Sequence, residues 1–227
     1  MVEILFKNKD VVIISKKAGI GSQSDITGDK DALSYTKELL TESGEKSDLW
    51  LVHRLDRVVG GLLVFARNKG SAARLSELMA REGLTKEYLA VVEGEVSSGK
   101  LSDYLYKDSK QSKAFVISSE RRGAKYAELE YDALAYYSGE KGIYTLVSVR
   151  LKTGRFHQIR AQFASRKTPL VGDGKYGSRD NKAKMPALFA TRLSFNLGKE
   201  KIEAKKLPDT SEYPWSLFSS TLKTEND

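Results

Sequence analysis

The chain has 227 residues, of which 40% are hydrophobic and 30% are charged, a balance typical of a globular protein. It contains no cysteine, which excludes disulfides and thiolate metal sites and is typical of a reducing compartment. No apolar run approaches the roughly 20 residues that span a bilayer. The N-terminal residues have neither the basic leader nor the apolar core of a signal peptide. These features predict a cytoplasmic protein that does not enter a membrane.

Positive charge is concentrated in one part of the chain. The net charge is +8, yet residues 150–192 alone contain eleven Lys and Arg against two acids, Asp173 and Asp180. The rest of the chain is therefore close to neutral. A concentrated basic stretch is typical of a surface that binds phosphates. We therefore expect a polyanionic partner, most simply a nucleic acid.

The first part of the chain alternates short strands with two amphipathic helices. Residues 31–42 have helical spacing with acids near the start, and residues 69–81 carry an apolar stripe that Gly83 ends. Residues 62–66 form a short apolar run, typical of a strand buried on both faces. The two glycines before it indicate a turn or a close backbone approach. Further strands are expected at 3–6, 11–15 and 86–94.

The middle of the chain is rich in strands. Tyr126 and Glu128 alternate with Ala127 and Leu129, a period of two that indicates a strand with two different faces. Residues 138–142 are typical of a hairpin turn. At this spacing, an antiparallel sheet is favoured over parallel crossovers. The strands are expected at 101–106, 114–118, 124–136 and 143–151.

No internal repeat, low-complexity segment or linker divides the sequence. The elements therefore predict one α/β domain of the α+β type over residues 1–227. Its central sheet is expected to be mixed, mostly antiparallel and flanked by helices.

A charged cluster precedes the buried strand at 62–66. Asp56 lies between Arg54 and Arg57, directly after Leu55. Burial raises the pKa of a carboxyl and neighbouring cations lower it. With arginine on both sides, we expect Asp56 to be ionised at neutral pH, which suits a nucleophile or a general base. From the spacing alone, however, a structural Arg–Asp pair or a turn aspartate is the favoured interpretation.

A second cluster lies at 153–160. Phe156, Ile159 and Phe163 have the spacing of one apolar helix face, and His157 and Arg160 are three residues apart on a neighbouring face. The chain has only two histidines, one in each cluster, so no metal site is expected. Taken alone, each histidine is best interpreted as a hydrogen-bonded structural residue.

Three motifs resemble one known family. His-Arg-Leu-Asp at 53–56, followed by Gly-Leu-Leu-Val-Phe-Ala, resembles the catalytic signature of the RluA-type pseudouridine synthases. Residues 86–94 resemble the second motif of that family, and residues 151–160 with 169–177 resemble the third. The resemblance runs with gaps from about residue 3 to 218 and implies the catalytic fold of these enzymes.

The resemblance implies roles for individual residues. Asp56 takes the position of the catalytic aspartate, Tyr88 that of the tyrosine that contacts the target base, and Arg160 that of the arginine that pairs with the aspartate. Arg54 is expected to fill the space that the flipped base leaves or to hold a phosphate. The remaining residues expected to contact RNA are His53, Arg155, His157 and Lys175.

The sequence departs from the family pattern at a few positions. Lys17 stands where the family usually has proline, and Val59-Gly60 stand where it often has Thr-Ser. Gln162 stands where a second histidine is common. The small N-terminal RNA-binding domain of many relatives is not expected here.

The resulting hypothesis is isomerisation of uridine to pseudouridine in structured ribosomal or transfer RNA. It needs neither a metal nor a nucleotide cofactor, and a monomer is expected. Asp56 could attack the sugar or act at the ring, and the sequence leaves both routes open.

Two alternatives come from other functional classes. A non-catalytic RNA-binding or RNA-chaperone protein that retains the fold would bind RNA without any dependence on Asp56. A carbohydrate hydrolase usually needs two carboxylates about 5–10 Å apart, and neither cluster contains a second acid.

Overall fold

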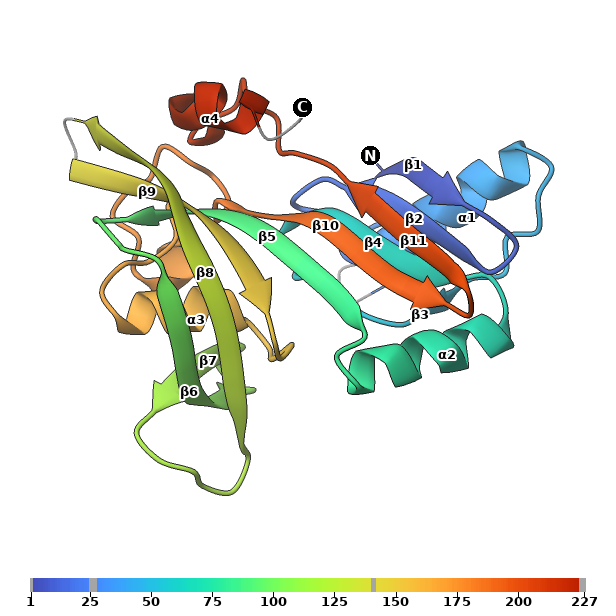
Figure 1. The fold of residues 1–227 in the computed structure, drawn as a ribbon, viewed down its shortest axis with the longest axis horizontal. Coiled ribbons are helices and arrows are strands. Elements are labelled where there is room, and N and C mark those ends of the chain that lie inside the picture. Colours follow the sequence, from blue (N-terminus) through green and yellow to red (C-terminus); the bar gives the residue numbers. More distant parts are fainter. Residues whose placement is uncertain (1, 25–27, 140–141, 225–227) are drawn as a thin grey trace. The chain divides into compact units, whose positions relative to one another are not determined.

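The computed structural model describes residues 2–24, 28–139 and 142–224. The chain divides into two compact units, each built from segments that are distant in the sequence (Figure 1). The first unit comprises Met1–Lys86 and Phe189–Pro208, and the second comprises Glu87–Leu188 and Asp209–Asp227. We describe the two units separately.

The first unit is a mostly antiparallel sheet with two helices. Its strands follow the order β1-β2-β4-β10-β11, and β3 also pairs with β4. The pairing of β4 with β10 is parallel and the other pairs are antiparallel. The elements are β1 (Val2–Lys7), β2 (Val11–Lys16), α1 (Ala32–Glu42), β3 (Trp50–Leu51), β4 (Gly60–Ala66), α2 (Lys69–Ala80), β10 (Leu188–Leu197) and β11 (Glu200–Lys205).

Strand β4 is the centre of this unit. All of its residues are buried, which confirms the predicted strand with two covered faces. Gly61 has a positive φ of 113°, and a Cβ at this position would lie 2.3 Å from the Ala190 carbonyl oxygen. The predicted close approach is therefore also confirmed, because only glycine lets β10 come this near to β4.

The helices of the first unit begin where the sequence predicts. Asp31 and Asn68 are the N-caps of α1 and α2, and each side chain accepts a backbone N–H of the first turn. At the end of α2, the Gly83 N–H donates to the Leu78 carbonyl at 2.7 Å. The left-handed residue is Glu82, with φ of 58°, rather than Gly83 itself.

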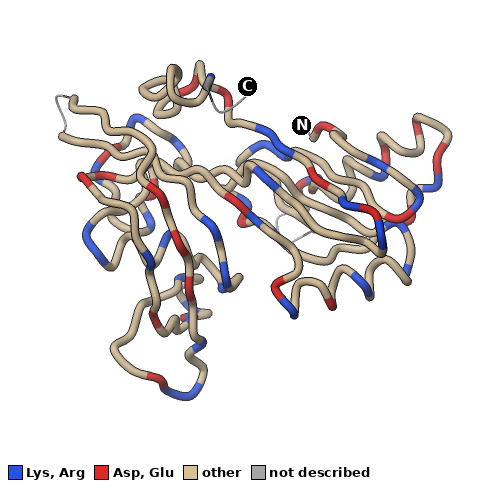
Figure 2. The backbone as a smooth tube through the Cα atoms, viewed as in Figure 1, with Lys and Arg blue, Asp and Glu red and all other residues tan. Residues whose placement is uncertain are grey.

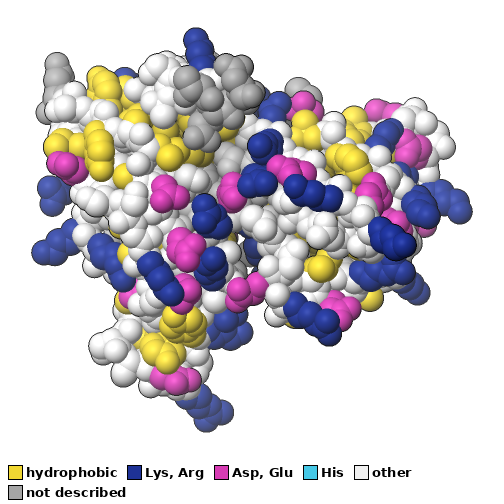
Figure 3. Space-filling view, viewed as in Figure 1, with side chains coloured by type: hydrophobic (Ala, Val, Ile, Leu, Met, Phe, Trp, Pro, Cys, Tyr) yellow, Lys and Arg dark blue, Asp and Glu magenta, His cyan; other side chains and the backbone are white. Residues whose placement is uncertain are grey.

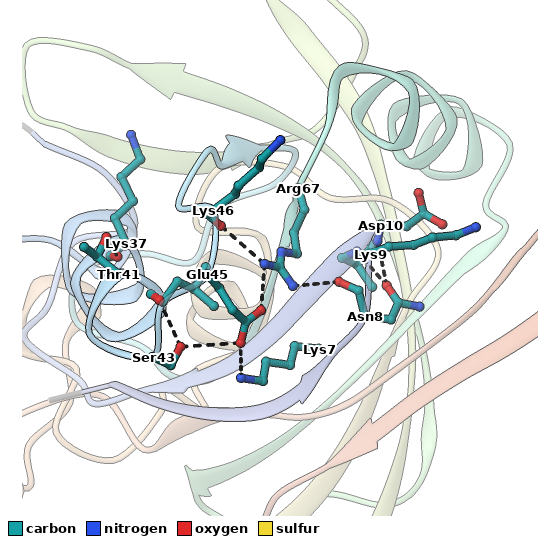
Figure 4. Close-up of polar contacts among 12 residues, drawn as sticks. Lys7, Asn8, Lys9, Asp10, Lys37, Thr41, Ser43, Glu45, Lys46 and Arg67 are labelled. Carbon is teal, nitrogen blue, oxygen red and sulfur yellow. Dashed lines mark hydrogen bonds and ion pairs between the residues drawn. The ribbon is translucent and has the colours of Figure 1, made fainter.

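A polar network lies where β4 ends (Figure 4). The Glu45 carboxylate accepts hydrogen bonds from Lys7 and from Arg67 Nη2, the latter at 2.8 Å. Arg67 Nη1 donates to the Asn8 carbonyl at 2.9 Å. These bonds tie the end of α1 and the β1–β2 turn to β4. The loop that contains Asp56 lies at the opposite end of β4, directly before Gly60.

The second unit is an antiparallel sheet in the order β5-β9-β8-β6-β7. Strand β5 begins in the first unit and continues into the second. The predicted turn at 138–142 includes residues 140–141, which lie outside the described residues, and Gly139 pairs with Gly142 on either side of them. The elements are β5 (Leu84–Glu93), β6 (Gly99–Asp108), β7 (Lys113–Ile117), β8 (Ala124–Gly139), β9 (Gly142–Leu151), α3 (Gln158–Ser165), the short 3-10 helices η1 (Gly174–Tyr176) and η2 (Trp215–Phe218), and α4 (Ser219–Thr224).

Helix α3 covers one face of this sheet. Ala127 and Leu129 of β8 are fully buried, whereas Tyr126 is 44% exposed, which confirms the predicted period of two. Ala127 belongs to the apolar cluster that α3 completes with Ala161. Both units therefore fit the predicted mixed, mostly antiparallel sheet with flanking helices. None of the helices in the described ranges is long and apolar enough to cross a membrane.

Candidate active site

The loop that precedes β4, residues 53–59, carries the predicted catalytic aspartate and is called the Asp56 loop below. Asp56 is half-buried, Leu55 is buried and Arg54 is exposed. The Arg57 carbonyl accepts the Gly19 N–H at 2.8 Å, and Arg57 Nη1 pairs with Asp29 at 2.7 Å. The loop is thus attached to the segment that follows β2.

A buried lysine organises this loop. Lys16, at the end of β2, is only 1% exposed. Its ammonium donates to the carbonyl oxygens of Ile20 at 2.9 Å, Asp56 at 3.2 Å and Arg57 at 3.4 Å, and it also contacts the Val59 carbonyl closely. Burial lowers the pKa of Lys16 to about 8, although the charge of Asp56 opposes this shift. Lys16 therefore holds the backbone that follows the Asp56 side chain, from the Asp56 carbonyl to that of Val59.

Ser22 fixes the residue before Asp56. Its hydroxyl donates to the Leu55 carbonyl at 2.9 Å and accepts the Leu55 N–H at 3.0 Å. Both backbone groups of Leu55 are satisfied by one buried side chain, so the backbone that leads into Asp56 has little freedom.

His53 attaches the other end of the loop to β4. The Val64 N–H donates to His53 Nε2 at 3.3 Å. Burial, with a smaller contribution from the charge of Lys86, lowers the pKa of His53 to about 3. The imidazole is therefore neutral at physiological pH and acts as a hydrogen-bond acceptor. This contact is a structural one, and the expected contact of His53 with RNA stays a prediction.

In the second unit, Arg160 of α3 forms a buried ion pair. Its Nε and Nη2 donate to the two carboxylate oxygens of Asp173 at 2.6 and 2.8 Å. The two residues are 4% and 1% exposed. A bidentate pair of this kind fixes the guanidinium in one orientation. The predicted pairing of Arg160 with Asp56 stays a prediction.

His157 lies just before α3 rather than within it. Its φ is 52°, a left-handed conformation, so the prediction that it shares a helix surface with Arg160 is wrong. The two side chains nevertheless meet at Tyr176. His157 Nδ1 lies 3.0 Å from the Tyr176 hydroxyl, and the Arg160 guanidinium lies 5.0 Å from the centre of the Tyr176 ring.

The sheet register places Tyr88 on the face that α3 covers. Tyr88 of β5 is buried and pairs with Val149, which pairs in turn with Tyr131 of β8. Directly paired residues point to the same face of a sheet. The Tyr131 ring packs edge-on against Phe163 of α3 at 5.0 Å. The second unit therefore presents Tyr88 and the helix that carries Arg160 on one side of its sheet.

The two other predicted cations lie on the surface near His157. Arg155 is exposed, and its Nε donates to the Tyr126 carbonyl at 2.8 Å. Lys175 is also exposed and donates to the carbonyls of Gln111 and Ser112 at 3.3 and 3.0 Å. Both lysine and arginine keep charged groups at the surface, as a phosphate contact requires.

Several site residues were not identified from the sequence. Lys16 and Ser22 hold the Asp56 loop, and Asp173 and Tyr176 hold Arg160. The available signal was motif context alone, because Lys16 opens the Lys-Lys-Ala-Gly stretch. Gln162, one of the departures, donates to Asp103 at 2.7 Å within the second unit. Among the described residues, no group of three or more His, Cys, Asp or Glu could hold a metal ion.

The chain is similar to proteins of one family. The family model for RNA pseudouridylate synthases matches residues 10–165, more than half of the chain, and this range contains Asp56, Tyr88 and Arg160. Ribosomal large subunit pseudouridine synthase D of Borreliella burgdorferi is 30% identical over 223 residues, which are 94% of this chain and 65% of that protein. The tRNA pseudouridine synthase C of Haemophilus ducreyi is 31% identical over 182 residues, 77% of this chain and 74% of that protein.

The fold also matches a solved structure. Human RNA Pseudouridylate Synthase Domain Containing 1 has a TM-score of 0.76 at 22% identity, covering 95% of this chain and 86% of that chain. At this identity the likeness establishes the fold. The chain spans just under two thirds of the Borreliella relative and about three quarters of the Haemophilus ducreyi relative.

Proposed function

The chain belongs to the RluA-type family of RNA pseudouridine synthases, which are isomerases, and we propose that it converts uridine in structured RNA to pseudouridine. The reaction is balanced within one nucleotide. The N1–C1′ bond breaks, the uracil turns, a C5–C1′ bond forms, and the proton on C5 moves to N1. No other reactant is needed. The base must leave its stack to reach the enzyme, as in other base-modifying reactions.

In this proposal Asp56 is the catalytic group, as nucleophile at the sugar or as base at the ring. The observation that supports it best is the way the loop is held. Lys16 binds the carbonyls of Asp56 and Arg57, and Ser22 binds both backbone groups of Leu55, so the main chain is held on both sides of the Asp56 side chain. A loop fixed through its main chain can present a carboxylate in one position, which is what a catalytic group requires.

Tyr88 and Arg160 complete the proposed catalytic set. Tyr88 stacks on the uracil or moves a proton, and Arg160 orients Asp56. Support for Arg160 comes from its fixed guanidinium, which Asp173 holds through two hydrogen bonds. Arg54, which is exposed on the Asp56 loop, fills the space of the flipped base or holds a phosphate. These roles require the two units to work as one catalytic domain.

The substrate is ribosomal or transfer RNA. One relative is named a ribosomal large subunit enzyme and another a tRNA enzyme, and both are about 30% identical to this chain. The basic stretch at 150–192 supports an RNA substrate but does not distinguish the two classes. The monomeric state and the cytoplasmic location stay predictions.

The purified protein tests this proposal. Total RNA from a strain that lacks the protein is incubated with the wild type or with Asp56→Asn, and pseudouridine is measured by mass spectrometry of the nucleosides. The wild type should add pseudouridine, and Asp56→Asn should add none while binding RNA with nearly unchanged affinity. Appreciable product from Asp56→Asn would reject Asp56 as the catalytic group.

A further inference from the structure

A group of cations surrounds His157 in the second unit. Burial and, to a smaller extent, the charges of Arg160, Lys175 and Lys107 together lower the pKa of His157 to about 3. The imidazole is therefore neutral in a strongly positive neighbourhood. Asp173 neutralises Arg160, but Lys107 and Lys175 remain beside the ring. A positive potential of this kind favours a bound anion.

Two lysines of the β6–β7 hairpin are held over aromatic rings of this neighbourhood. The Lys107 ammonium lies 4.6 Å from the centre of the Phe156 ring, and Phe156 stacks on His157 with 3.8 Å between ring centres. The Lys113 ammonium lies 4.9 Å from the centre of the Tyr176 ring. Cation–π contacts thus hold the Lys107 ammonium over the Phe156–His157 stack and the Lys113 ammonium over Tyr176, with Phe115 as a second ring 5.4 Å from Lys113. We call Lys107, Lys113, His157 and Lys175 the hairpin cluster.

The hairpin itself is tied to this cluster. Lys175 of η1 donates to the Gln111 and Ser112 carbonyls in the β6–β7 turn. The Ala114 N–H at the start of β7 donates to the Tyr176 hydroxyl at 2.8 Å, which is also the hydroxyl that His157 contacts. The lysines are therefore presented by a fixed scaffold.

Little negative charge offsets these lysines. Residues 107–113 contain three lysines and one acid, Asp108. The Asp108 carboxylate accepts hydrogen bonds from the backbone N–H groups of Lys110 and Gln111 at 2.9 and 3.0 Å, so it stabilises the β6–β7 turn. The hairpin cluster thus keeps a net positive charge.

The acids of β8 lie elsewhere and have their own partners. Figure 2 shows that acidic residues follow β8, and Figure 3 shows them interspersed with Lys and Arg on the surface. Glu128 pairs with Lys100 at 2.8 Å, and Glu130 pairs with Lys152 at 3.2 Å. Because Leu129 between them is buried beneath α3, Glu128 and Glu130 point to the opposite face of the sheet. They do not neutralise the hairpin cluster.

We propose that the hairpin cluster binds a backbone phosphate of the substrate RNA, with Lys107 and Lys113 as the principal ligands. This inference rests on the proposed function for the identity of the anion. The cluster lies beside Arg160 and on the face of the sheet that carries Tyr88, so it would hold RNA close to the proposed catalytic residues of this unit. A free phosphate ion offers the same chemistry as a phosphodiester, and the experiment separates the two.

The binding experiment compares two double variants that remove the same charge. Lys107→Ala/Lys113→Ala removes two lysines of the cluster, and Lys69→Ala/Lys199→Ala removes two exposed lysines of the first unit. The affinity for a labelled RNA stem-loop with uridines in its loop is measured over a range of salt concentrations. Loss of a phosphate contact reduces the slope of log K against log salt by about 1. Because both lysines bind one phosphate, we expect the cluster variant to lose about 1 from the slope and at least about tenfold in affinity.

The control variant should lose less than half as much of either quantity. Equal losses in the two variants, or an unchanged slope in the cluster variant, would overturn the proposal. Lys107→Arg/Lys113→Arg should restore most of the affinity, because arginine also binds phosphate. Thermal unfolding of each variant verifies the fold. Competition with inorganic phosphate at the same ionic strength identifies a free-ion site, since an RNA site should be displaced only weakly.

The outcomes are separable from those of the proposed function. A wild type that makes pseudouridine, together with an unaffected cluster variant, rejects this inference alone. A wild type that makes no pseudouridine rejects the function, while the stem-loop measurement still tests the cluster. A further readout is the imidazole of His157, whose NMR signals are readily assigned because the chain has only two histidines. Bound RNA should raise the pKa of His157 and leave that of His53 unchanged, and the opposite pattern would contradict the proposed place of binding.

Discussion

Each of the two units contains one buried cation beside a proposed catalytic position, and the two are stabilised differently. Lys16 in the first unit is surrounded by backbone carbonyls of the Asp56 loop. Arg160 in the second unit is held by the carboxylate of Asp173. One cation orders a loop through dipoles, and the other is itself ordered by a charge.

The two cations should therefore respond differently when their contacts are removed. A lysine held by dipoles keeps a lowered pKa and can lose its proton, whereas arginine stays charged at any accessible pH. Losing Asp173 would leave Arg160 as an uncompensated buried charge. Losing Lys16 would leave a loop of unpaired carbonyls. We therefore expect the second region to control stability and the first to control the position of the catalytic group.

The largest effect on stability is expected at the buried ion pair. Asp173→Leu should destabilise the protein by about 3–5 kcal/mol, because the charge of Arg160 is left without a partner. The double variant Arg160→Met/Asp173→Leu should recover most of that loss in urea unfolding. It should remain inactive if Arg160 orients Asp56. Full activity in the stable double variant would show that Arg160 has only a structural role.

A smaller effect on stability, but a clear one on rate, is expected at Lys16. Lys16→Met keeps an unbranched side chain one atom shorter than lysine and removes its donors, so the Asp56 loop loses its main attachment. Misplacement of a catalytic group by about 1 Å can reduce the rate about 100-fold. We expect kcat to fall by about that factor with little change in KM, measured as single-turnover and steady-state pseudouridine formation. A change confined to KM would contradict a positioning role.

The two cations also predict different responses to alkaline pH. The pKa of Lys16 is about 8 in the folded protein, whereas an exposed lysine, as in the unfolded chain, has a pKa of 10.5. Between these values the unfolded chain binds more protons, so the free energy of unfolding of the wild type should rise with pH relative to Lys16→Met. The same comparison with the Arg160→Met/Asp173→Leu variant should show no such slope. Urea unfolding at pH 7.5 and 10 measures both. If the difference in unfolding free energy between the wild type and Lys16→Met does not change between these pH values, the lowered pKa of Lys16 is contradicted.

The smallest effect at neutral pH is expected at the two histidines. Each has a pKa of about 3 when folded, below the usual 6.5, so the unfolded chain binds more protons between these values. Stability should fall as the pH drops from 6.5 toward 3, and His53→Gln should fall less steeply than the wild type. Because both rings are neutral near pH 7, pH–rate profiles from pH 6 to 8 should show no histidine titration. A step near pH 6.5 that disappears in His157→Gln would contradict this account.

The sequence predicted the elements well where the pattern is local. The stripe of α2, the alternation along β8 and the apolar run of β4 each depend on neighbouring residues, and the structure confirms them. The departure at His157 has a local cause that periodicity does not capture. A left-handed residue at the N-cap turns the chain before α3 begins, so spacing along the sequence does not give a shared helix face.

The parts of the site that were missed depend on contacts between distant residues. Lys16 lies in a Lys-Lys pair, and lysine is usually exposed, so the residues around it do not indicate that it is buried among the carbonyls of a loop forty residues away. Asp173 is one of only two acids in the basic stretch, and only the fold brings it to Arg160, thirteen residues away. The motifs located the candidate groups, and the structure supplies the residues that hold them.

The most direct test of the central claim is a map of pseudouridine across total cellular RNA. The strain would lack this protein and carry the wild-type chain, Asp56→Asn or an empty vector. If the chain is a pseudouridine synthase that depends on Asp56, one or a few sites should disappear in the deletion strain and return only with the wild type. If those sites also return with Asp56→Asn, or if no site changes in the deletion strain, the account is contradicted.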